Sequence, residues 1–282
     1  MLTVLRFVLV AFFTLGCTTA FAGPVFLTGH DPDFHAPNSA GARNLFRAGL
    51  DFVSGGTYNV AGSKFLWVEG RVGDELVGEA IPVGHRIGEA GLGSLGLTLG
   101  TEYDRANAAE IAGINLSAYT AIVVASSYGG LLTRVELDAL IARKDDIRDF
   151  VNAGGGVMAL AECDADFVTA CGADLLGSGA DLFGFLPVMV GSVVPSPPFT
   201  VTPYGIANFG LANTDVNDPT HNSFNEVGGL HIVDVGGTTE IPTTLAGDVL
   251  IDDGGFVPEP GTTLLLGSGL LGLVAFTRRR RR

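Results

Sequence analysis

A short stretch near the amino terminus is the richest in side chains that could do chemistry. It contains His30, Asp31, Asp33 and His35. Carboxylate oxygens favour calcium or magnesium, and imidazole nitrogens favour zinc or another transition metal. One interpretation is therefore a site for a divalent cation, and this cation is the cofactor that the sequence suggests. The alternative is a capped turn, in which the two aspartates accept hydrogen bonds from nearby amides beside Pro32.

A second candidate for chemistry is Cys163, which closely follows the apolar run 157–161. The residues two positions before and after it, Ala161 and Ala165, are small, as the sharp turn that presents a nucleophile requires. Candidate catalytic partners of this thiol are Glu162 and His221, or His231 with Asp234. One hypothesis is therefore a thiol nucleophile for acyl transfer.

Buried strands must position these groups. Residues 121–126 and 157–161 are continuous apolar runs, which are typical of strands covered on both faces. Between them Thr133 and Glu136 form a capping box that starts a single helix, and the glycines at 154–156 end it. Two strands joined by one helix predict a right-handed parallel βαβ unit.

The same pattern predicts further elements along the chain. Strands are expected at 24–28, 64–69, 230–234 and 244–251, and helices after Asn38 or Ser39 and at 107–114. Ligand chemistry on a parallel sheet lies at the carboxyl ends of its strands. The residues expected on that rim are His30, Asp31, Asp33, His35, Glu69, Ser126, Ser127, Tyr128, Glu162, Cys163 and Asp164.

The strand order and the position of Cys163 resemble the class I glutamine amidotransferase-like fold over residues 25–165. The resemblance implies a three-layer α/β fold with a parallel, flavodoxin-like sheet, and a single α/β domain is expected over residues 23–255. It also implies catalysis by the thiol. The chain departs from that family because it lacks Gly-x-Cys-x-Gly and the later His-x-Glu pair. These departures favour a non-catalytic domain.

Residues 1–22 have the composition of a secretory signal peptide. Arg6 precedes an apolar stretch at 7–15, and residues 20–22 form a small-x-small cleavage site for signal peptidase. The mature chain is then expected to begin at Gly23. Lipoprotein processing at Cys17 is the alternative, although Thr14 occupies a position where such sites usually have a larger apolar residue.

Cys163 and Cys171 are the two cysteines left after removal of the signal peptide. An even number of cysteines in an oxidising compartment indicates a disulfide. Closing this short loop would stabilise the fold by about 2–3 kcal/mol on the chain-entropy estimate. A disulfide, a pair of buried free thiols and a nucleophile at Cys163 are the three alternatives.

Residues 256–282 combine three ordered elements. The span 261–277 contains 17 residues without a charge, just long enough to cross a bilayer. The five arginines after it would stay on the cytoplasmic side. A buried core helix is the alternative interpretation. The residues that define the tail are Val257, Pro258, Glu259, Pro260, Arg278, Arg279, Arg280, Arg281 and Arg282.

This tail resembles the PEP-CTERM sorting signal of Gram-negative bacteria. The resemblance implies that exosortase cuts near the Pro-Glu-Pro motif and releases or re-anchors the protein at the cell surface. It predicts an inner-membrane intermediate, and then a location on the cell surface or in the extracellular matrix. Signal peptidase, exosortase, the inner membrane and exopolysaccharide are the partners that follow.

The charge balance excludes one class of partner. Between Gly23 and Val257 there are 10 basic and 29 acidic residues, and such a surface repels phosphate backbones. Nucleic-acid binding is therefore not expected. The function that we predict is a non-catalytic surface or matrix protein that binds a sugar or a divalent cation. The alternative is an extracellular hydrolase that uses Cys163 or a metal at the loop 30–35.

Overall fold

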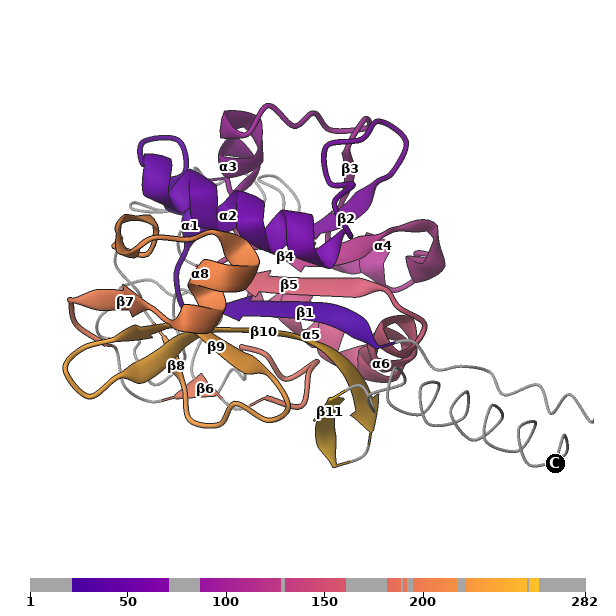
Figure 1. Ribbon diagram of the computed structural model, residues 1–282. Helices are drawn as coiled ribbons and strands as arrows, with labels where there is room; N and C mark the ends of the chain where they lie inside the picture. The colour runs from indigo at the N-terminus through magenta and orange to yellow at the C-terminus, as the bar shows by residue number, and fades with distance from the viewer. Residues whose placement is uncertain are drawn as a thin grey trace, which may run out of the picture.

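The computed structural model describes residues 22–70, 87–127, 130–160, 182–188, 190–191, 195–217, 222–252 and 254–258. Within these ranges a nine-stranded sheet runs in the order β3-β2-β4-β5-β1-β10-β9-β7, with β11 paired to β10 (Figure 1). The parallel strands are β1 (Gly23–Thr28), β2 (Phe65–Val68), β3 (Tyr103–Ala106), β4 (Ala121–Val124) and β5 (Gly156–Leu160). The antiparallel strands are β7 (Phe199–Val201), β9 (His231–Gly236), β10 (Ile241–Asp252) and β11 (Gly255–Pro258). Strands β6 (Val190–Gly191) and β8 (Ser223–Phe224) form a separate pair.

Helices connect and cover these strands. They are α1 (Pro32–His35), α2 (Ala40–Val53), α3 (Glu89–Ser94), α4 (Ala108–Ile111), α5 (Arg134–Ala142), α6 (Lys144–Asn152) and α8 (Pro203–Phe209). Two short 3-10 turns are η1 (Leu116–Ala118) and η3 (Asn213–Asp215). The predicted cap of the second helix is confirmed, because Ser39 Oγ accepts a hydrogen bond from the Ala42 amide at 3.2 Å.

The prediction of an α/β domain built on a parallel sheet is confirmed for the first five strands. Every residue of β2, β4 and β5 is buried, as their continuous apolar sequences predicted. From β4 to β5 the chain moves across the sheet toward β1, and from β1 to β2 it moves back. Right-handed crossovers in opposite directions place their helices on opposite faces. Figure 1 accordingly shows α2 in front of the sheet and α5 and α6 partly hidden behind it.

The strand order differs from the flavodoxin-like order 2-1-3-4-5 in one respect. β1, the first strand of the chain, lies beside β5 at the position that the fifth strand occupies in that order. The connections that leave β2 and β4 nevertheless run in opposite directions, toward β3 and toward β5. The carboxyl ends of β2 and β4 therefore form the place where an open α/β sheet usually binds its ligands.

The capping box of Thr133 and Glu136 is confirmed, but the single helix predicted after it is two helices. The break falls at Arg143, whose backbone has φ −105° and ψ 16°. Its guanidinium donates hydrogen bonds to the carbonyl oxygens of Ile111 and Ile114 at 2.7 and 2.8 Å. These long-range bonds occur at the break between the two helices, and a local periodicity cannot reveal them.

The predicted fold is a parallel sheet, whereas the late strands join that sheet in the antiparallel direction. β9 and β10 form an antiparallel hairpin, β10 is antiparallel to β1, and β7 is antiparallel to β9. The physical reason is the length of the connection. Only four residues separate Gly236 from Ile241, whereas a parallel pairing needs a crossover of about a dozen residues or more.

The predicted domain ends at residue 255, where strand β11 begins. The chain turns there into β11, which pairs with the end of β10. Phe256 of β11 is only 8 % exposed and belongs to the hydrophobic core. The described sheet therefore extends to Pro258, the second residue of the sequence Val257-Pro-Glu-Pro.

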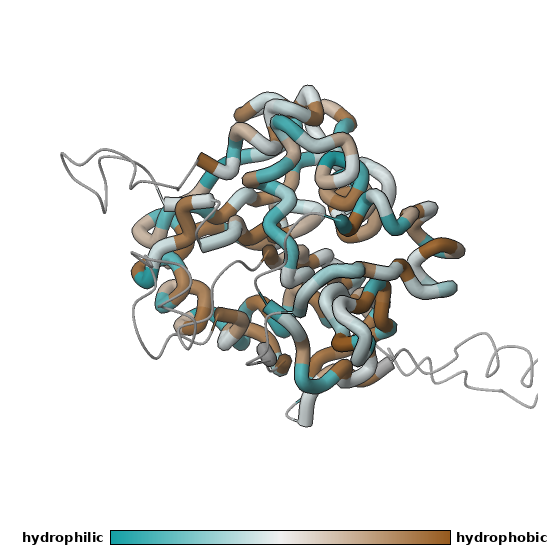
Figure 2. The backbone as a smooth tube through the Cα atoms, turned by 90° about the vertical axis from the view of Figure 1, so that its left-hand side faces the viewer, coloured by the Kyte–Doolittle hydropathy of each residue, from teal (hydrophilic) through white to brown (hydrophobic). Residues whose placement is uncertain are grey.

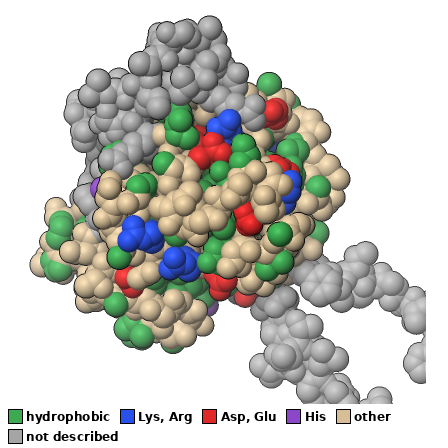
Figure 3. Space-filling view, turned by 90° about the horizontal axis from the view of Figure 1, so that it is seen from above, with side chains coloured by type: hydrophobic (Ala, Val, Ile, Leu, Met, Phe, Trp, Pro, Cys, Tyr) green, Lys and Arg blue, Asp and Glu red, His purple; other side chains and the backbone are tan. Residues whose placement is uncertain are grey.

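Hydrophobic and hydrophilic segments alternate along the backbone (Figure 2). The face seen from above in Figure 3 has Lys and Arg side chains interspersed with Asp and Glu. Ion pairs in the described part of the chain include Lys64–Asp104 and Arg134–Asp138, both at 2.8 Å. The described part of that face therefore does not present a patch of a single charge.

Gly156 provides a test of how closely α2 packs on β5. A methyl group on this glycine would lie 1.9 Å from the Val53 carbonyl oxygen. We expect Gly156→Ala to lower the free energy of unfolding by about 1–3 kcal/mol in urea titrations, because backbone has to move. Gly113→Ala is the matched control, since a methyl group there has nothing within 4 Å. An equal loss in both variants would contradict this packing.

Candidate functional site

Three segments far apart in sequence meet at the carboxyl ends of the parallel strands. Asp33 lies in α1, after β1, and its Oδ2 accepts hydrogen bonds from the amide and the hydroxyl of Ser126, after β4. The two distances are 2.9 and 3.0 Å. Ser126 Oγ in turn accepts a hydrogen bond from the Gly130 amide at 2.7 Å. The sequence prediction that these segments share one edge of the sheet therefore holds for Asp33 and Ser126.

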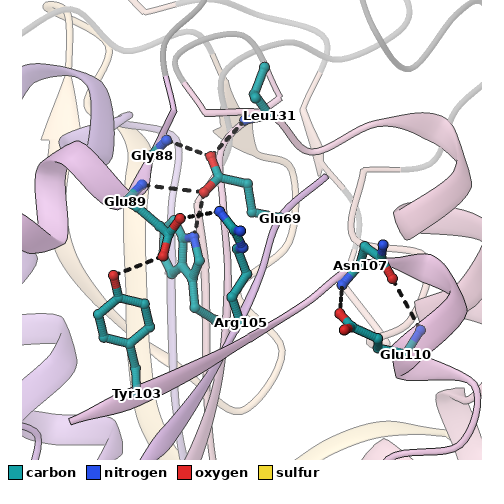
Figure 4. A network of polar contacts seen from close by, with 9 residues as sticks. Glu69, Gly88, Glu89, Tyr103, Arg105, Asn107, Glu110 and Leu131 are labelled. Atoms are coloured by element: carbon teal, nitrogen blue, oxygen red, sulfur yellow. Dashed lines mark hydrogen bonds and ion pairs between the residues drawn. The ribbon is translucent and has the colours of Figure 1, made fainter. Parts of the chain in front are cut away.

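Glu69, directly after β2, is the most densely bonded side chain of the site (Figure 4). Its Oε1 accepts hydrogen bonds from the amides of Gly88 and Leu131, the latter at 3.1 Å. Its Oε2 accepts hydrogen bonds from Trp67 Nε1 at 2.7 Å and from the Glu89 amide at 3.3 Å. Four N–H donors thus converge on one buried carboxylate, which ties two loops to the end of β2.

Strand β3 supports the same network from the edge of the sheet. Tyr103 donates its hydroxyl to Glu89 Oε1 at 2.9 Å, and Arg105 forms an ion pair with Glu89 Oε2 (Figure 4). Burial and the neighbouring Glu89 raise the pKa of Tyr103 above its usual range, so the phenol stays protonated. Nearby, Asn107 and Glu110 form the capping box that begins α4.

The carboxylates of Asp33 and Glu69 approach each other beside Gly88. A methyl group on Gly88 would lie 2.9 Å from Asp33 Oδ2 and 3.0 Å from Glu69 Oε1, so these two oxygens are at most about 6 Å apart. Burial raises the pKa of Asp33 to about 6, although hydrogen bonds from Ser126 act in the opposite direction. Burial raises the pKa of Glu69 to about 7, and the charge of Asp33 adds to this increase.

A second buried polar pair lies farther along the sheet. His30 Nε2 lies 3.0 Å from Asp234 Oδ2 of β9, and Thr243 donates its hydroxyl to the same oxygen. His30 and Asp234 are 1 % and 0 % exposed. Within the described ranges, His30 Nδ1 and Asp234 Oδ1 have no hydrogen-bond partner.

The side chains of the predicted cation-binding stretch contact different partners. His30 turns to Asp234, His35 lies 3.5 Å from Asp31, and Asp33 turns to Ser126. In the part of the chain that the structure describes, no group of three His, Cys, Asp or Glu side chains could hold a metal ion. The cation site therefore stays a prediction.

The predicted pairing of His231 with Asp234 is wrong. Both residues lie in β9, where a register shift interrupts the pairing between them, and their side chains have different surroundings. Asp234 is buried against His30, whereas His231 is exposed and stacks on Tyr204 with ring centroids 4.3 Å apart. A single aspartate inside the apolar strand His231–Gly236 was the sequence signal for a buried polar partner.

Several predicted site residues lie outside the described ranges. They are Tyr128, Glu162, Cys163, Asp164, Cys171, His221, Glu259, Pro260 and the five terminal arginines. The thiol nucleophile and the disulfide therefore stay predictions. None of the helices within the described ranges is long and apolar enough to span a bilayer. The predicted membrane span at 261–277 is outside those ranges.

Burial of Asp33 and Glu69 predicts a characteristic pH dependence of stability. Both pKa values are higher in the folded protein than the ordinary values of 3.8 for aspartate and 4.5 for glutamate. The folded state then holds more protons than the unfolded state between about pH 4 and pH 7, so the free energy of unfolding falls as the pH rises. For Glu69 the fall is on the order of 3 kcal/mol.

Urea titrations across this range measure that fall. We expect Glu69→Gln and Asp33→Asn to flatten the slope, whatever they do to the absolute stability. Asp138→Asn is the control, because the Asp138 side chain is 57 % exposed. A slope that is unchanged in both buried-site variants would show that these carboxyl groups do not titrate in this way.

A comparison with known protein families matches residues 256–282 to the PEP-CTERM protein-sorting motif. Neither the comparison with curated proteins nor that with solved structures produced a match. The family match covers the tail predicted from the Pro-Glu-Pro motif, the uncharged span and the arginine cluster. The chain therefore carries a PEP-CTERM sorting motif, which supports an exported protein that exosortase processes.

Proposed function

We propose that this protein is a non-catalytic component of the cell surface or extracellular matrix of a Gram-negative bacterium. The sorting motif at 256–282 is the observation that carries this proposal. In the proposed route, signal peptidase removes residues 1–22, the span 261–277 holds the intermediate in the inner membrane, and exosortase then processes the tail. Exopolysaccharide is the partner that we propose at the destination.

The bonding at the sheet edge supports a structural domain. The Glu69 carboxylate uses both oxygens to hold protein N–H groups, and Asp33 uses Oδ2 to hold Ser126. Asp33 Oδ1 accepts a hydrogen bond from the Phe34 amide at 3.1 Å. Carboxyl groups whose oxygens already accept hydrogen bonds from the protein hold loops in place and are not available to bind a substrate. The same proposal includes the binding of a sugar or a divalent cation by this domain.

Fractionation of cells with and without exosortase tests the route. We expect the protein to leave the inner-membrane fraction and lose its arginine cluster only when exosortase is present. Glu259→Ala should keep the full-length protein in that fraction, because it alters the sorting motif. Glu226→Ala is the matched control, since this glutamate is exposed and outside the motif. Equal mass and location in both hosts would contradict the proposal.

A thiol hydrolase is the second candidate, and the His30–Asp234 pair favours it. A carboxylate that orients a histidine is two thirds of a nucleophilic triad. Leu160, the last residue of β5, pairs with Thr28, two residues before His30. Cys163 follows Leu160 by three residues, which span at most about 11 Å. The nucleophile of this candidate is therefore within chain reach of the edge where His30 lies.

Alkylation by iodoacetamide separates the two candidates. We expect Cys163 and Cys171 to react only after reduction, because a disulfide is the preferred assignment of these thiols. Reaction without reduction, slowed about tenfold or more in His30→Ala, would support the hydrolase instead. His231→Ala is the control, because His231 is exposed and does not contact Asp234. Mass spectrometry of the labelled peptides provides the measurement.

A further inference from the structure

The sorting motif begins inside the folded domain. Strand β11 pairs antiparallel with the end of β10, with Leu250 opposite Val257 and Val249 opposite Pro258. The residues Val257 and Pro258 are therefore part of the sheet as well as of the Val-Pro-Glu-Pro sequence. Pro258 is compatible with this place, because β11 is a short strand whose last residue needs no amide donor.

Phe256 anchors β11 to the core. It is 8 % exposed, belongs to the hydrophobic core and lies opposite Ile251 in the sheet register. A methyl group on Gly228 would be 3.4 Å from its ring, so the loop before β9 packs on the same side chain. Val257, the next residue, is 36 % exposed and points the other way. Removing β11 from the sheet would expose an aromatic side chain and unpair the end of β10.

Little chain separates this strand from the proposed membrane span. Only Glu259 and Pro260 lie between Pro258 and the start of the uncharged stretch 261–277. Three residue steps cover at most about 11 Å, so the folded domain is held close to the membrane surface. A processing enzyme needs an accessible, extended segment, and residues paired in a sheet do not offer one.

We propose that β11 keeps the start of the sorting motif folded on the domain, so that exosortase acts after Pro258 and β11 stays with the exported protein. This inference rests on the exosortase route described above. Water or an acceptor amine adds to the carbonyl carbon of a peptide bond beyond Pro258. The C–N bond breaks, and the proton released by the attacking group goes to the new amino group of the departing tail.

Mass spectrometry of the protein recovered from exosortase-containing cells tests this assignment. We expect the carboxyl-terminal peptide of the processed protein to include Phe256, Val257 and Pro258. A carboxyl terminus at or before Val257 would overturn the inference while leaving exosortase processing intact. Recovery of the full-length chain alone would overturn the processing itself, and the inference with it.

Variants at Phe256 test whether docking of β11 sets the cleavage position. We expect Phe256→Ala to speed hydrogen exchange at the β11 amides and to raise several-fold the share of molecules that end before Pro258. Phe256→Leu retains a large apolar side chain and should keep the wild-type end. Leu97→Ala is the control for general destabilisation, because Leu97 is 7 % exposed and follows α3, which Figure 1 shows far from β11.

Two results would refute the proposed role of docking. One is fast exchange in β11 of Phe256→Ala with an unchanged carboxyl terminus, which would mean that the enzyme ignores docking. The other is unchanged exchange in β11, which would mean that Phe256 does not hold the strand. If Leu97→Ala shifts the terminus as strongly as Phe256→Ala, the effect is one of overall stability and the inference fails.

Discussion

The Glu69 carboxylate is the constraint on which the arrangement of the sheet edge depends. Its four N–H partners come from β2 itself, from the entry to α3 and from the loop before α5. A buried N–H group that loses its acceptor is costly, and four such donors share this one side chain. Glu69 therefore fixes α3 over β2, and the Tyr103 and Arg105 contacts to Glu89 connect this arrangement to the outermost strand.

Much of the fold could be predicted because its signals are local. Continuous apolar runs mark β4 and β5, whose burial on both faces follows from helices on each side of the sheet. The Thr133 and Glu136 capping box marks the start of α5, since both of its bonds close within one turn. The sorting tail could also be predicted from the sequence, because its three elements follow one another in a fixed order within residues 256–282.

The rest depends on contacts that leave no local trace. β3 is short and carries two polar residues, Asp104 and Arg105, so its sequence lacks the apolar run that marked its neighbours. Glu69 binds amides that lie 19 and 62 positions away, and any residue type could supply those amides. The partner of His30 is Asp234, 204 positions later. The sequence suggested His231 as the partner of Asp234 because the two are close in the chain. In the fold, Asp234 contacts His30 instead.

The central position of β1 affects the timing of folding in an exported chain. β1 is the first strand of the chain, yet one of its neighbours is β5 and the other is β10, where Gly23 pairs with Val249 over two hundred residues later. Such distant pairing carries a large loop-closure cost and makes assembly slow. A chain that becomes available from its amino terminus therefore cannot complete the pairing of β1 until β10 is present. The completed sheet forms only after nearly the whole chain has emerged.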